Sequence, residues 1–360
     1  MLDPLASGAT IGILGGGQLG RMLAMAASKL GFRPVIYTPP GDTPAVDVTT
    51  QSVIGAYDEW AALERFVGLV DRVTLEFENI PTATIDWLAE RVPVAPDAYA
   101  LRIAQDRSDE KNFLNAHGIA TASFAEVSSM PDFDAVWFEP PWILKTRRLG
   151  YDGKGQARIA ARDPELLETA WHGVGAVPSV VEGLVPFLRE ISVIVARGAD
   201  GTVRCYDPGE NVHETGILRR TTVPAAINSE TATAARAIAE RIVTALDYIG
   251  VMGVEMFETT EGLIVNEIAP RVHNTGHWTL EACAVSQFEQ QIRAVASWPL
   301  GDPVRHADAV MENLIGEEIG RVAAIPEPGV SYHSYGKASA RPGRKMGHVT
   351  RLSPMTEPTR

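Results

Sequence analysis

The chain has 360 residues, of which 45% are hydrophobic and 21% charged, and its formal net charge is −13. A chain of this size predicts two or three domains with full hydrophobic cores. Its acidic balance argues against a general nucleic-acid-binding or anionic-membrane surface, and no apolar run approaches the ~20 residues that span a bilayer. The N-terminus lacks the basic and apolar segments of a signal peptide. Because the two cysteines, Cys205 and Cys283, have no zinc-like spacing, we expect a cytoplasmic protein without disulfide bonds.

Residues 1–97 predict a domain in which strands and helices alternate. The expected strands are residues 10–14, 34–37, 52–55 and 72–78, and the expected helices are residues 21–30, 59–70 and 83–91. Such alternation is typical of a Rossmann-like parallel sheet with helices on both faces.

A glycine-rich turn lies between the first strand and the first helix. Gly15, Gly17 and Gly20 match the G-x-G-x-x-G pattern of dinucleotide-binding folds. A NAD enzyme would also need an acidic residue after the second strand, where this chain has Thr38, with Asp42 only later. We therefore favour an anion site at the helix N-terminus, where free N–H groups meet a phosphate. Glycines that serve only close packing remain the structural alternative.

Residues 98–300 predict a second, larger domain with mainly antiparallel strands. The expected strands are residues 142–145, 157–160, 179–182, 190–195 and 203–206, and the expected helices are residues 98–117, 230–248 and 286–295. The chain beyond Pro299 is richer in Gly, Pro and Arg, so residues 301–360 predict a small C-terminal domain.

A second glycine-rich element follows the strand that carries Lys145. It is the loop Gly150–Gln156, which contains Lys154 and has no Walker pattern. Flexible backbone N–H groups together with lysines suit the binding of a triphosphate under a mobile lid. On its own, the loop could equally be a hairpin tip with a solvated lysine.

Two acidic residues at strand ends suit the rest of a nucleotide. Glu182 combines a carboxylate with exposed backbone, which fits the edge of an adenine and a ribose, and Glu190 could accept the ribose hydroxyls. Acidic residues are common at strand ends, so an ordinary surface role is the alternative.

A predicted hairpin carries two glutamates. Alternating apolar residues on either side of a loop at Thr260, Glu261 and Gly262 predict two paired strands. Glu255 and Glu267 are each six residues from Glu261, so we expect them to face each other about 5 Å apart. Two such carboxylates repel unless a cation lies between them, and magnesium prefers carboxylates combined with phosphate oxygens. A solvated hairpin edge is the alternative.

Two further segments concentrate cations and histidines. Arg271 follows the second glutamate strand and is placed to hold a developing anion beside the metal. His273 and His277 lie four residues apart, but without an H-E-x-x-H pattern or a nearby Cys a zinc site is disfavoured. The basic segment 334–348 could be a nucleic-acid-binding arm, but its Gly, Pro, Tyr and Met residues favour an ordered turn that folds back onto a substrate phosphate.

Together these motifs resemble the ATP-grasp superfamily and, within it, the 5-(carboxyamino)imidazole ribonucleotide synthetases of purine biosynthesis. The resemblance spans nearly the whole chain, and its most specific segments are residues 15–22, 74–81, 150–156, 211–218, 266–277, 286–289 and 335–348. It implies a Rossmann-like domain over residues 1–97, an ATP-grasp domain over residues 98–300 with a lid subdomain at about 118–182, and a small C-terminal domain over residues 301–360.

The resemblance also implies an activity. Members of that family use ATP, magnesium and bicarbonate to carboxylate 5-aminoimidazole ribonucleotide, with ADP and phosphate as the other products, and a homodimer is usual. A formate-using ATP-grasp transformylase acting on glycinamide ribonucleotide has a similar architecture and is the nearest alternative. A NAD-dependent oxidoreductase would leave the lysine loop and the glutamate hairpin unexplained. A nucleotide-binding regulator without activity is disfavoured because every expected charge is present.

Residue roles follow from the same resemblance. The implied ATP-binding residues are Arg107, Lys145, Gly150, Tyr151, Asp152, Gly153, Lys154, Gly155, Gln156, Glu182, Gly183, Leu184, Val185, Glu190, His213, Asn266 and Glu267. The implied ribonucleotide-binding residues are Gln18, Leu19, Glu76, Tyr151, Arg271, His273, Asn274, Lys337 and Arg344. Arg271, Asp152, His273 and Lys337 are the implied catalytic residues, and Glu255 and Glu267 the metal ligands.

The chain departs from the family pattern at a few positions. Many ATP-grasp ligases have Asn two residues after the second metal carboxylate, where this chain has Ala269, which counts against relatives of the biotin-carboxylase type. Thr275 and Trp278 replace the more usual Ser and Tyr and are mild changes.

Overall fold

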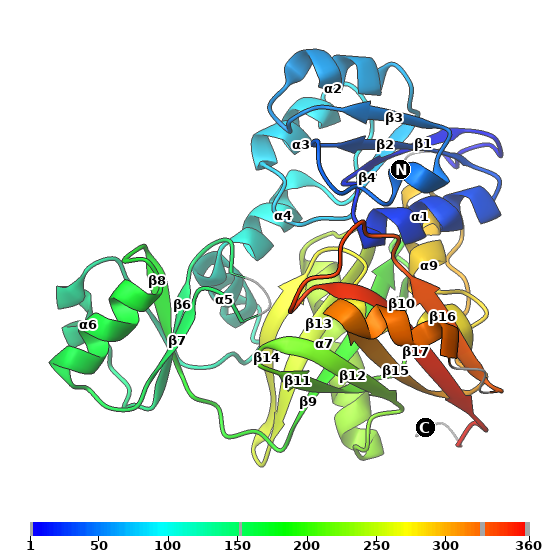
Figure 1. Cartoon of the computed structure of the whole chain (residues 1–360). Coiled ribbons are helices and arrows are strands. Elements are labelled where there is room, and N and C mark those ends of the chain that lie inside the picture. Colours follow the sequence, from blue (N-terminus) through cyan, green and yellow to red (C-terminus); the bar gives the residue numbers. More distant parts are fainter. Residues whose placement is uncertain (1–2, 151–152, 325–327, 357–360) are drawn as a thin grey trace.

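The computed structural model describes residues 3–150, 153–324 and 328–356, whose strands form three β-sheets (Figure 1). Within these ranges no helix has the length and apolar character that crossing a membrane requires. Both cysteines are free.

The first sheet is parallel and has the strand order β3-β2-β1-β4. Its strands are β1 (Thr10–Leu14), β2 (Arg33–Thr38), β3 (Gln51–Ile54) and β4 (Arg72–Leu75), and its helices are α1 (Gln18–Lys29), α2 (Trp60–Val67) and α3 (Thr82–Ala89). Ile11 and Ile13 pack with α1 on one face, whereas Leu14 and Val35 pack with α2 and α3 on the other. The predicted parallel sheet with both faces covered is therefore confirmed. Because β4 ends at Leu75 rather than at residue 78, Glu76 and Glu78 lie beyond the carboxyl end of the sheet.

A small antiparallel sheet lies to one side of the molecule (Figure 1). It consists of β5 (Phe124–Val127), β8 (Ser179–Gly183), β6 (Trp142–Thr146) and β7 (Gln156–Ile159), covered by η2 (Met130–Ala135) and α6 (Pro164–Gly173). Its own hydrophobic core includes Phe133, Trp142 and Trp171. This unit contains the segment that the sequence predicts as a lid.

The largest sheet has nine strands among the described residues, in the order β14-β13-β9-β11-β12-β15-β17-β16, with β10 beside β9. These strands are β9 (Arg189–Arg197), β10 (Val203–Cys205), β11 (Gly209–Glu214), β12 (Ile217–Val223), β13 (Gly250–Thr259), β14 (Gly262–Ala269), β15 (Asp308–Ile315), β16 (Val330–Ser334) and β17 (Lys345–Ser353). The side chains of β9 alternate, so Val193 and Val195 face α7 (Ser229–Ala245) and Ile194 and Ala196 face α9 (Gln287–Val295). The C-terminal strands β15, β17 and β16 extend this sheet and do not form a separate one.

The N-terminal and central parts of the chain share one hydrophobic core, because helix α1 packs on α9. Short elements η1 (Val46–Val48), η3 (Asn274–Gly276), α8 (Thr279–Ala282) and η4 (Gly316–Ala324) connect the larger ones. The predicted helical stretch over residues 98–117 consists of two helices, because extended backbone at Asp106 separates α4 (Ala98–Gln105) from α5 (Arg107–Ala116). The Asp106 side chain accepts the Ser108 N–H as the N-cap of α5, which explains the break.

Candidate active site

The glycine-rich turn before α1 holds a carboxylate of the protein itself. Glu76 accepts hydrogen bonds from the N–H groups of Gly17 (2.8 Å) and Gly20 (3.0 Å), at the positive end of the helix. A Cβ added to Gly15 or Gly17 would collide with the Glu76 side chain. The glycine pattern is therefore explained by the close approach of Glu76, and it gives no support to a dinucleotide site. The sequence did not predict that Glu76 would take up these two N–H groups.

The hairpin of β13 and β14 pairs Glu255 directly with Glu267, as predicted. The predicted three-residue loop is wrong, because Thr259 already pairs with Gly262 and only two residues form the turn. A β-bulge between these positions compensates for the missing loop residue: Met256 pairs with Val265, whereas Glu255 pairs with Glu267.

The bulge also decides which side chains face the site. Val265 and Ile268 both belong to the core under α7, although they are three positions apart in the strand, whereas regular alternation puts residues two positions apart on the same face. Between them Asn266 and Glu267 point away from that core. Asn266 Oδ1 lies 3.5 Å from Lys145 Nζ, and Glu267 Oε2 lies 3.4 Å from an Arg107 nitrogen. The bulge thus presents an amide and a carboxylate together beside Glu255.

The electrostatics of the hairpin fit a bound cation. Burial and the facing Glu267 carboxylate raise the pKa of Glu255 above its usual range. Two carboxylates and one amide oxygen are hard ligands that suit Mg²⁺, and phosphate oxygens and water would complete its coordination. Over the described ranges no three His, Cys, Asp or Glu side chains form a metal-binding group by themselves. The residues present therefore fit a metal that is shared with a phosphate ligand.

A buried ion-pair cluster lies between the lid sheet and α5. Glu182 pairs with Lys145 (2.8 Å) and Lys111 (3.2 Å), and the side chains of Glu182 and Lys111 are 5% and 1% exposed. Burial alone would raise the pKa of Glu182, but the two lysines outweigh it and lower that pKa to about 2. Nothing in the local sequence pattern distinguishes Lys111, so sequence reasoning missed it.

A second polar pair lies on the large sheet near the hairpin. His213 Nδ1 on β11 lies 2.5 Å from Glu190 Oε2 on β9, and Glu190 is in register with Phe257 of β13. Burial disfavours the imidazolium, but the hydrogen bond to Glu190 and the charge of Glu255 outweigh it and raise the pKa of His213. Glu190, predicted to accept the ribose hydroxyls, and His213, predicted to bind ATP, are thus adjacent, and they lie close to the paired glutamates.

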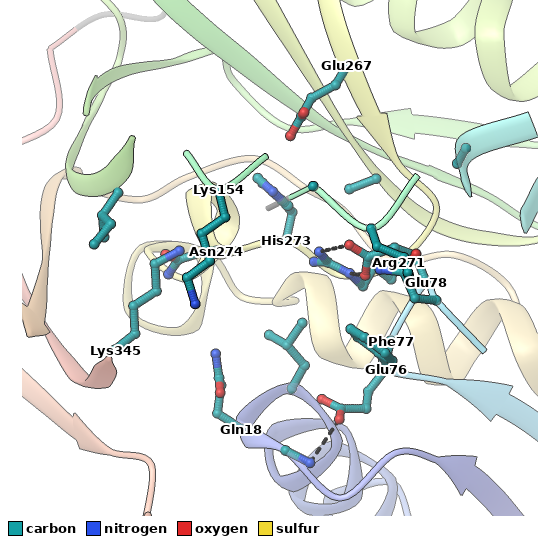
Figure 2. A pocket seen from close by; sticks show the side chains of 18 of the residues that line it. Gln18, Glu76, Phe77, Glu78, Lys154, Glu267, Arg271, His273, Asn274 and Lys345 are labelled. Atoms are coloured by element: carbon teal, nitrogen blue, oxygen red, sulfur yellow. Dashed lines mark hydrogen bonds and ion pairs between the residues drawn. The ribbon is translucent and has the colours of Figure 1, made fainter. Parts of the chain in front are cut away.

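The main cavity opens between the glycine-rich turn, the segment after β14 and the C-terminal loop (Figure 2). Its volume is about 690 Å³, and its described lining includes eight Lys or Arg residues but four Glu residues. Burial raises the pKa of two of these glutamates, Glu76 and Glu110, the latter to about 7. The cavity is therefore strongly positive in a chain whose net charge is −13, and it is suited to an anionic ligand.

Arg271 at the floor of this cavity is held by a carboxylate from the N-terminal sheet. Glu78 accepts two hydrogen bonds from the Arg271 guanidinium, one through Nε and one at 2.8 Å (Figure 2). The neighbouring His273 is fixed through its backbone, because Gln287 accepts its N–H at 2.8 Å and donates to its carbonyl at 2.7 Å. Burial and the charge of Arg271 lower the pKa of His273 well below its usual range, so its imidazole is neutral.

The C-terminal loop closes the cavity from the opposite side. Arg344 forms an ion pair of 2.6 Å with Asp42, whose carboxylate also accepts the Ala338 N–H. Lys337 donates to the Lys345 carbonyl at 2.7 Å, and burial followed by the charge of Arg344 lowers the pKa of Lys337 to about 8. Asp42, the acidic residue after β2, therefore orients the C-terminal loop.

Comparison with known proteins is consistent with this geometry. Three family profiles match successive parts of the chain: the ribonucleotide synthetase preATP-grasp domain (residues 8–105), the ATP-grasp domain (residues 112–288) and the phosphoribosylaminoimidazole carboxylase C-terminal domain (residues 309–360). The N5-carboxyaminoimidazole ribonucleotide synthase of Brucella melitensis is 51% identical over 356 residues, which cover 98% of each chain. This chain belongs to the N5-carboxyaminoimidazole ribonucleotide synthase family.

Solved structures of the synthase family share the fold. The ADP complex of an N5-carboxyaminoimidazole ribonucleotide synthetase superimposes with a TM-score of 0.94 at 36% identity, over 98% of this chain and 94% of that one. The Aspergillus clavatus synthase, solved with ADP and 5-aminoimidazole ribonucleotide, has a TM-score of 0.90 at 30% identity, over 97% and 95% of the two chains. The predicted ATP-grasp fold and the resemblance to this synthase family are both confirmed.

The predicted site residues fall into two adjoining groups in this family member. The cavity is lined by Gln18, Leu19, Glu76, Arg107, Gly150, Lys154, Glu267, Arg271, His273, Asn274, Lys337 and Arg344. Beside it, between the lid sheet and the large sheet, lie Lys145, Glu182, Glu190, His213, Glu255 and Asn266. The predicted residues Gly153, Gly155, Gln156, Gly183, Leu184 and Val185 belong to the loop and strand ends of the lid sheet. Tyr151 and Asp152 lie outside the described residues.

The cavity also contains residues that sequence reasoning missed. Glu78, Gln105 and Arg147 line it in addition to the predicted set, and Arg341 and Lys345 line it as part of the basic segment 334–348 that was expected to face a substrate phosphate. Glu78 lies within the segment 74–81 that carries the family resemblance, and that was the only available signal for it.

Proposed function

We propose that this chain carboxylates the exocyclic amine of 5-aminoimidazole ribonucleotide with bicarbonate, in a reaction that converts ATP to ADP and phosphate. The product is 5-(carboxyamino)imidazole ribonucleotide, an intermediate of purine biosynthesis. One observation carries the proposal: a strongly positive cavity adjoins a pair of facing carboxylates. A phosphorylated ribonucleotide suits the first and a metal-bound triphosphate suits the second.

The nucleotide would occupy the space between the lid sheet and the large sheet. Glu182 and the backbone of Gly183, Leu184 and Val185 would bind adenine, and Glu190 and His213 would bind the ribose side. Lys145, Arg107, Lys154 and the Gly150–Gln156 loop would bind the phosphates. Glu255 and Glu267, with Asn266 beside them, would hold magnesium. When bound, magnesium would supply positive charge that stabilises the phosphoryl group during transfer.

The ribonucleotide would occupy the positive cavity. The cations Lys337 and Arg344 would bind its phosphate end, because paired cations favour an anion, and Gln18 and Leu19 at the start of α1 would line the same part of the cavity. His273 and Asn274 would contact the imidazole and ribose. Glu76 would orient this end of the cavity through the glycine-rich turn.

The chemistry requires an activated form of bicarbonate, which is a poor electrophile at neutral pH. Attack of a bicarbonate oxygen on the γ-phosphorus of ATP releases ADP and forms carboxyphosphate. Arg271 would hold this anion, and Glu78 fixes its guanidinium plane through two hydrogen bonds. The neutral imidazole of His273, together with Asp152, would steer the substrate amine toward the carboxyphosphate carbon. The new C–N bond would form as the C–O bond to phosphate breaks, and inorganic phosphate would leave with the proton that the amine loses. Closure of the lid would exclude water from the short-lived intermediate.

We further propose a cytoplasmic homodimer with domains over residues 1–97, 98–300 and 301–360. Two free cysteines suit a reducing compartment.

The test is ADP release from ATP, magnesium and bicarbonate, with and without 5-aminoimidazole ribonucleotide. A strong increase on adding the ribonucleotide, with a labile carboxylated product, would support the proposal. Release that depends instead on formate and glycinamide ribonucleotide would replace the proposed reaction with that of a transformylase.

A further inference from the structure

A buried polar network leads from the cavity into the C-terminal strands. Asn274 lines the cavity, and behind it lie His277, Asn313, Tyr335 and His348, which come from η3, β15 and the segments around β16 and β17. The side chains are almost fully enclosed: Asn274 is 7% exposed, Asn313 2% and Tyr335 1%. Buried polar groups of this kind are costly unless each has a hydrogen-bond partner.

The two carboxamides of this network have only one consistent orientation. Asn313 Nδ2 lies 2.9 Å from the Leu218 carbonyl oxygen, which can only accept, so the amide nitrogen of Asn313 must face it. The second hydrogen of that nitrogen is donated to Asn274 Oδ1 at 2.7 Å. Asn313 Oδ1 in turn accepts from Asn274 Nδ2 at 3.0 Å. The orientation of both carboxamides therefore follows from one backbone carbonyl.

The same reasoning fixes the tautomer of His277. The remaining hydrogen of Asn274 Nδ2 points to His277 Nδ1 at 3.0 Å, so this ring nitrogen must be the acceptor. The Tyr335 hydroxyl lies 3.0 Å from His277 Nδ1 and 2.9 Å from His348 Nδ1, and its single proton can be donated to only one of these two nitrogens. Burial lowers the pKa of both histidines well below their usual range, which agrees with neutral rings.

One hydrogen-bonding capacity of Asn274 is left for a ligand. Both hydrogens of its amide nitrogen are donated within the network, and its oxygen accepts one hydrogen bond from Asn313. A carboxamide oxygen has two lone pairs, so the second lone pair of Oδ1 remains. Toward the cavity Asn274 can therefore act as an acceptor and cannot act as a donor.

We propose that Asn313 and His277 are positioning residues that hold the Asn274 carboxamide oxygen as a hydrogen-bond acceptor for an N–H or O–H group of the ribonucleotide. This inference rests on the proposed function for the identity of the ligand. Its geometric part, the fixed orientation of Asn274, does not depend on that function. The C-terminal strands thus contribute to substrate recognition indirectly, by orienting Asn274, in addition to the basic loop that lines the cavity.

The kinetic test removes the hydrogen-bond partners that hold the Asn274 side chain. Asn313→Leu and His277→Phe remove the partners with little change in size, and Asn274→Ala removes the acceptor itself. Each change should raise the KM for the ribonucleotide about tenfold, the cost of one misdirected hydrogen bond, and leave the KM for ATP within about twofold. As a control, Thr84→Val removes a buried hydrogen bond to the Tyr57 carbonyl, and since neither Thr84 nor Tyr57 lines the cavity, it should change neither constant.

A double-mutant cycle separates positioning from a general structural effect. If Asn313 acts through Asn274, Asn313→Leu should raise the KM no further in a chain that already carries Asn274→Ala. Multiplication of the two effects to about a hundredfold, or an equal rise in the KM for ATP, would overturn the proposal.

A measurement without substrate distinguishes failure of this inference from failure of the proposed function. The side-chain NH₂ signals of Asn274, assigned by their loss in Asn274→Ala, should be resolved and slow to exchange with solvent. They should exchange faster in Asn313→Leu and His277→Phe but not in Thr84→Val. Rapid exchange in the unaltered protein would contradict the fixed orientation of the Asn274 side chain, whatever substrate the protein uses.

Discussion

The two halves of the candidate site carry opposite charge: the hairpin is negative and the adjoining cavity is positive. On the hairpin of β13 and β14, Glu255 and Glu267 face each other, and their repulsion contributes to a raised pKa at Glu255. In the adjoining cavity, eight Lys or Arg residues meet four glutamates. The first half requires a cation and the second requires an anion. A metal-bound triphosphate beside a phosphorylated substrate satisfies both, which is why neither half alone would have identified the reaction.

The halves also differ in how they are built. The hairpin is local, since its two glutamates are 12 residues apart and are brought together by one turn and one bulge. The cavity is assembled from the start of α1, the segment after β14 and the C-terminal loop. Contacts such as Glu78 with Arg271 connect residues that are 193 positions apart. We therefore expect substitutions in the hairpin to affect chemistry and substitutions around the cavity to affect substrate affinity.

The largest effect is expected for the buried ion-pair cluster between the lid sheet and α5. Glu182→Gln leaves Lys111 and Lys145 without their carboxylate, and it should lower the free energy of unfolding by about 3 kcal/mol. Urea denaturation would measure the change. Glu90→Gln, which breaks an exposed pair with Arg91, is the matched control and should not alter stability measurably. Equal stability of the two variants would contradict the inferred importance of the cluster.

A second prediction concerns the carboxylate pair itself. Glu267→Gln should reduce turnover by about 10² or more at saturating magnesium, because the charge of the bound metal contributes several kcal/mol of transition-state stabilisation. The KM for the ribonucleotide should change little, since Glu267 belongs to the proposed ATP and metal site. Steady-state kinetics would show both effects, and near-wild-type turnover would exclude the metal assignment.

The cavity gives the converse prediction. Lys337→Ala should raise the KM for the ribonucleotide about tenfold, as expected for the loss of one charge-assisted hydrogen bond, with little change in the KM for ATP. Arg33→Ala, on the exposed end of β2, serves as a control for the loss of one positive charge. An unchanged KM in Lys337→Ala would mean that the C-terminal loop does not bind this substrate.

The pH dependence sharpens the same contrast. Burial and Arg344 lower the pKa of Lys337 to about 8, so its ammonium group is charged below pH 8 and neutral above it. A substrate phosphate, whose second pKa is about 6, keeps its charge throughout this range. The KM for the ribonucleotide should therefore rise above pH 8, and Lys337→Arg, which stays charged, should abolish that rise. A rise that persists in Lys337→Arg would assign the titration to another group.

The hairpin shows how far the sequence could predict this site. The predicted pairing of Glu255 with Glu267 is confirmed. The predicted loop is one residue too long, and the bulge at Asn266, which the sequence does not predict, makes up the difference. Alternation of apolar residues fixes which face of a strand is buried, but a bulge depends on packing against α7 and the lid, which no local pattern encodes.

The long-range contacts could not be predicted in the same way. The sequence predicted that Arg271 would bind an anion, but its fixation by Glu78 depends on how the N-terminal sheet packs against α9. The occupation of the α1 N-terminus by Glu76 is similar, because the same glycine pattern also fits a bound phosphate. Lys111 was missed because a lysine within a helix is normally a surface residue.

The most direct test is a crystal structure with Mn²⁺-ADP and 5-aminoimidazole ribonucleotide, with the metal located by anomalous scattering. We expect a single strong manganese peak between the carboxylates of Glu255 and Glu267, and the ribonucleotide phosphate beside Gln18, Lys337 and Arg344. Manganese bound away from the two glutamates, or a ribonucleotide outside the positive cavity, would contradict the division of the site into a metal-binding half and an anion-binding half.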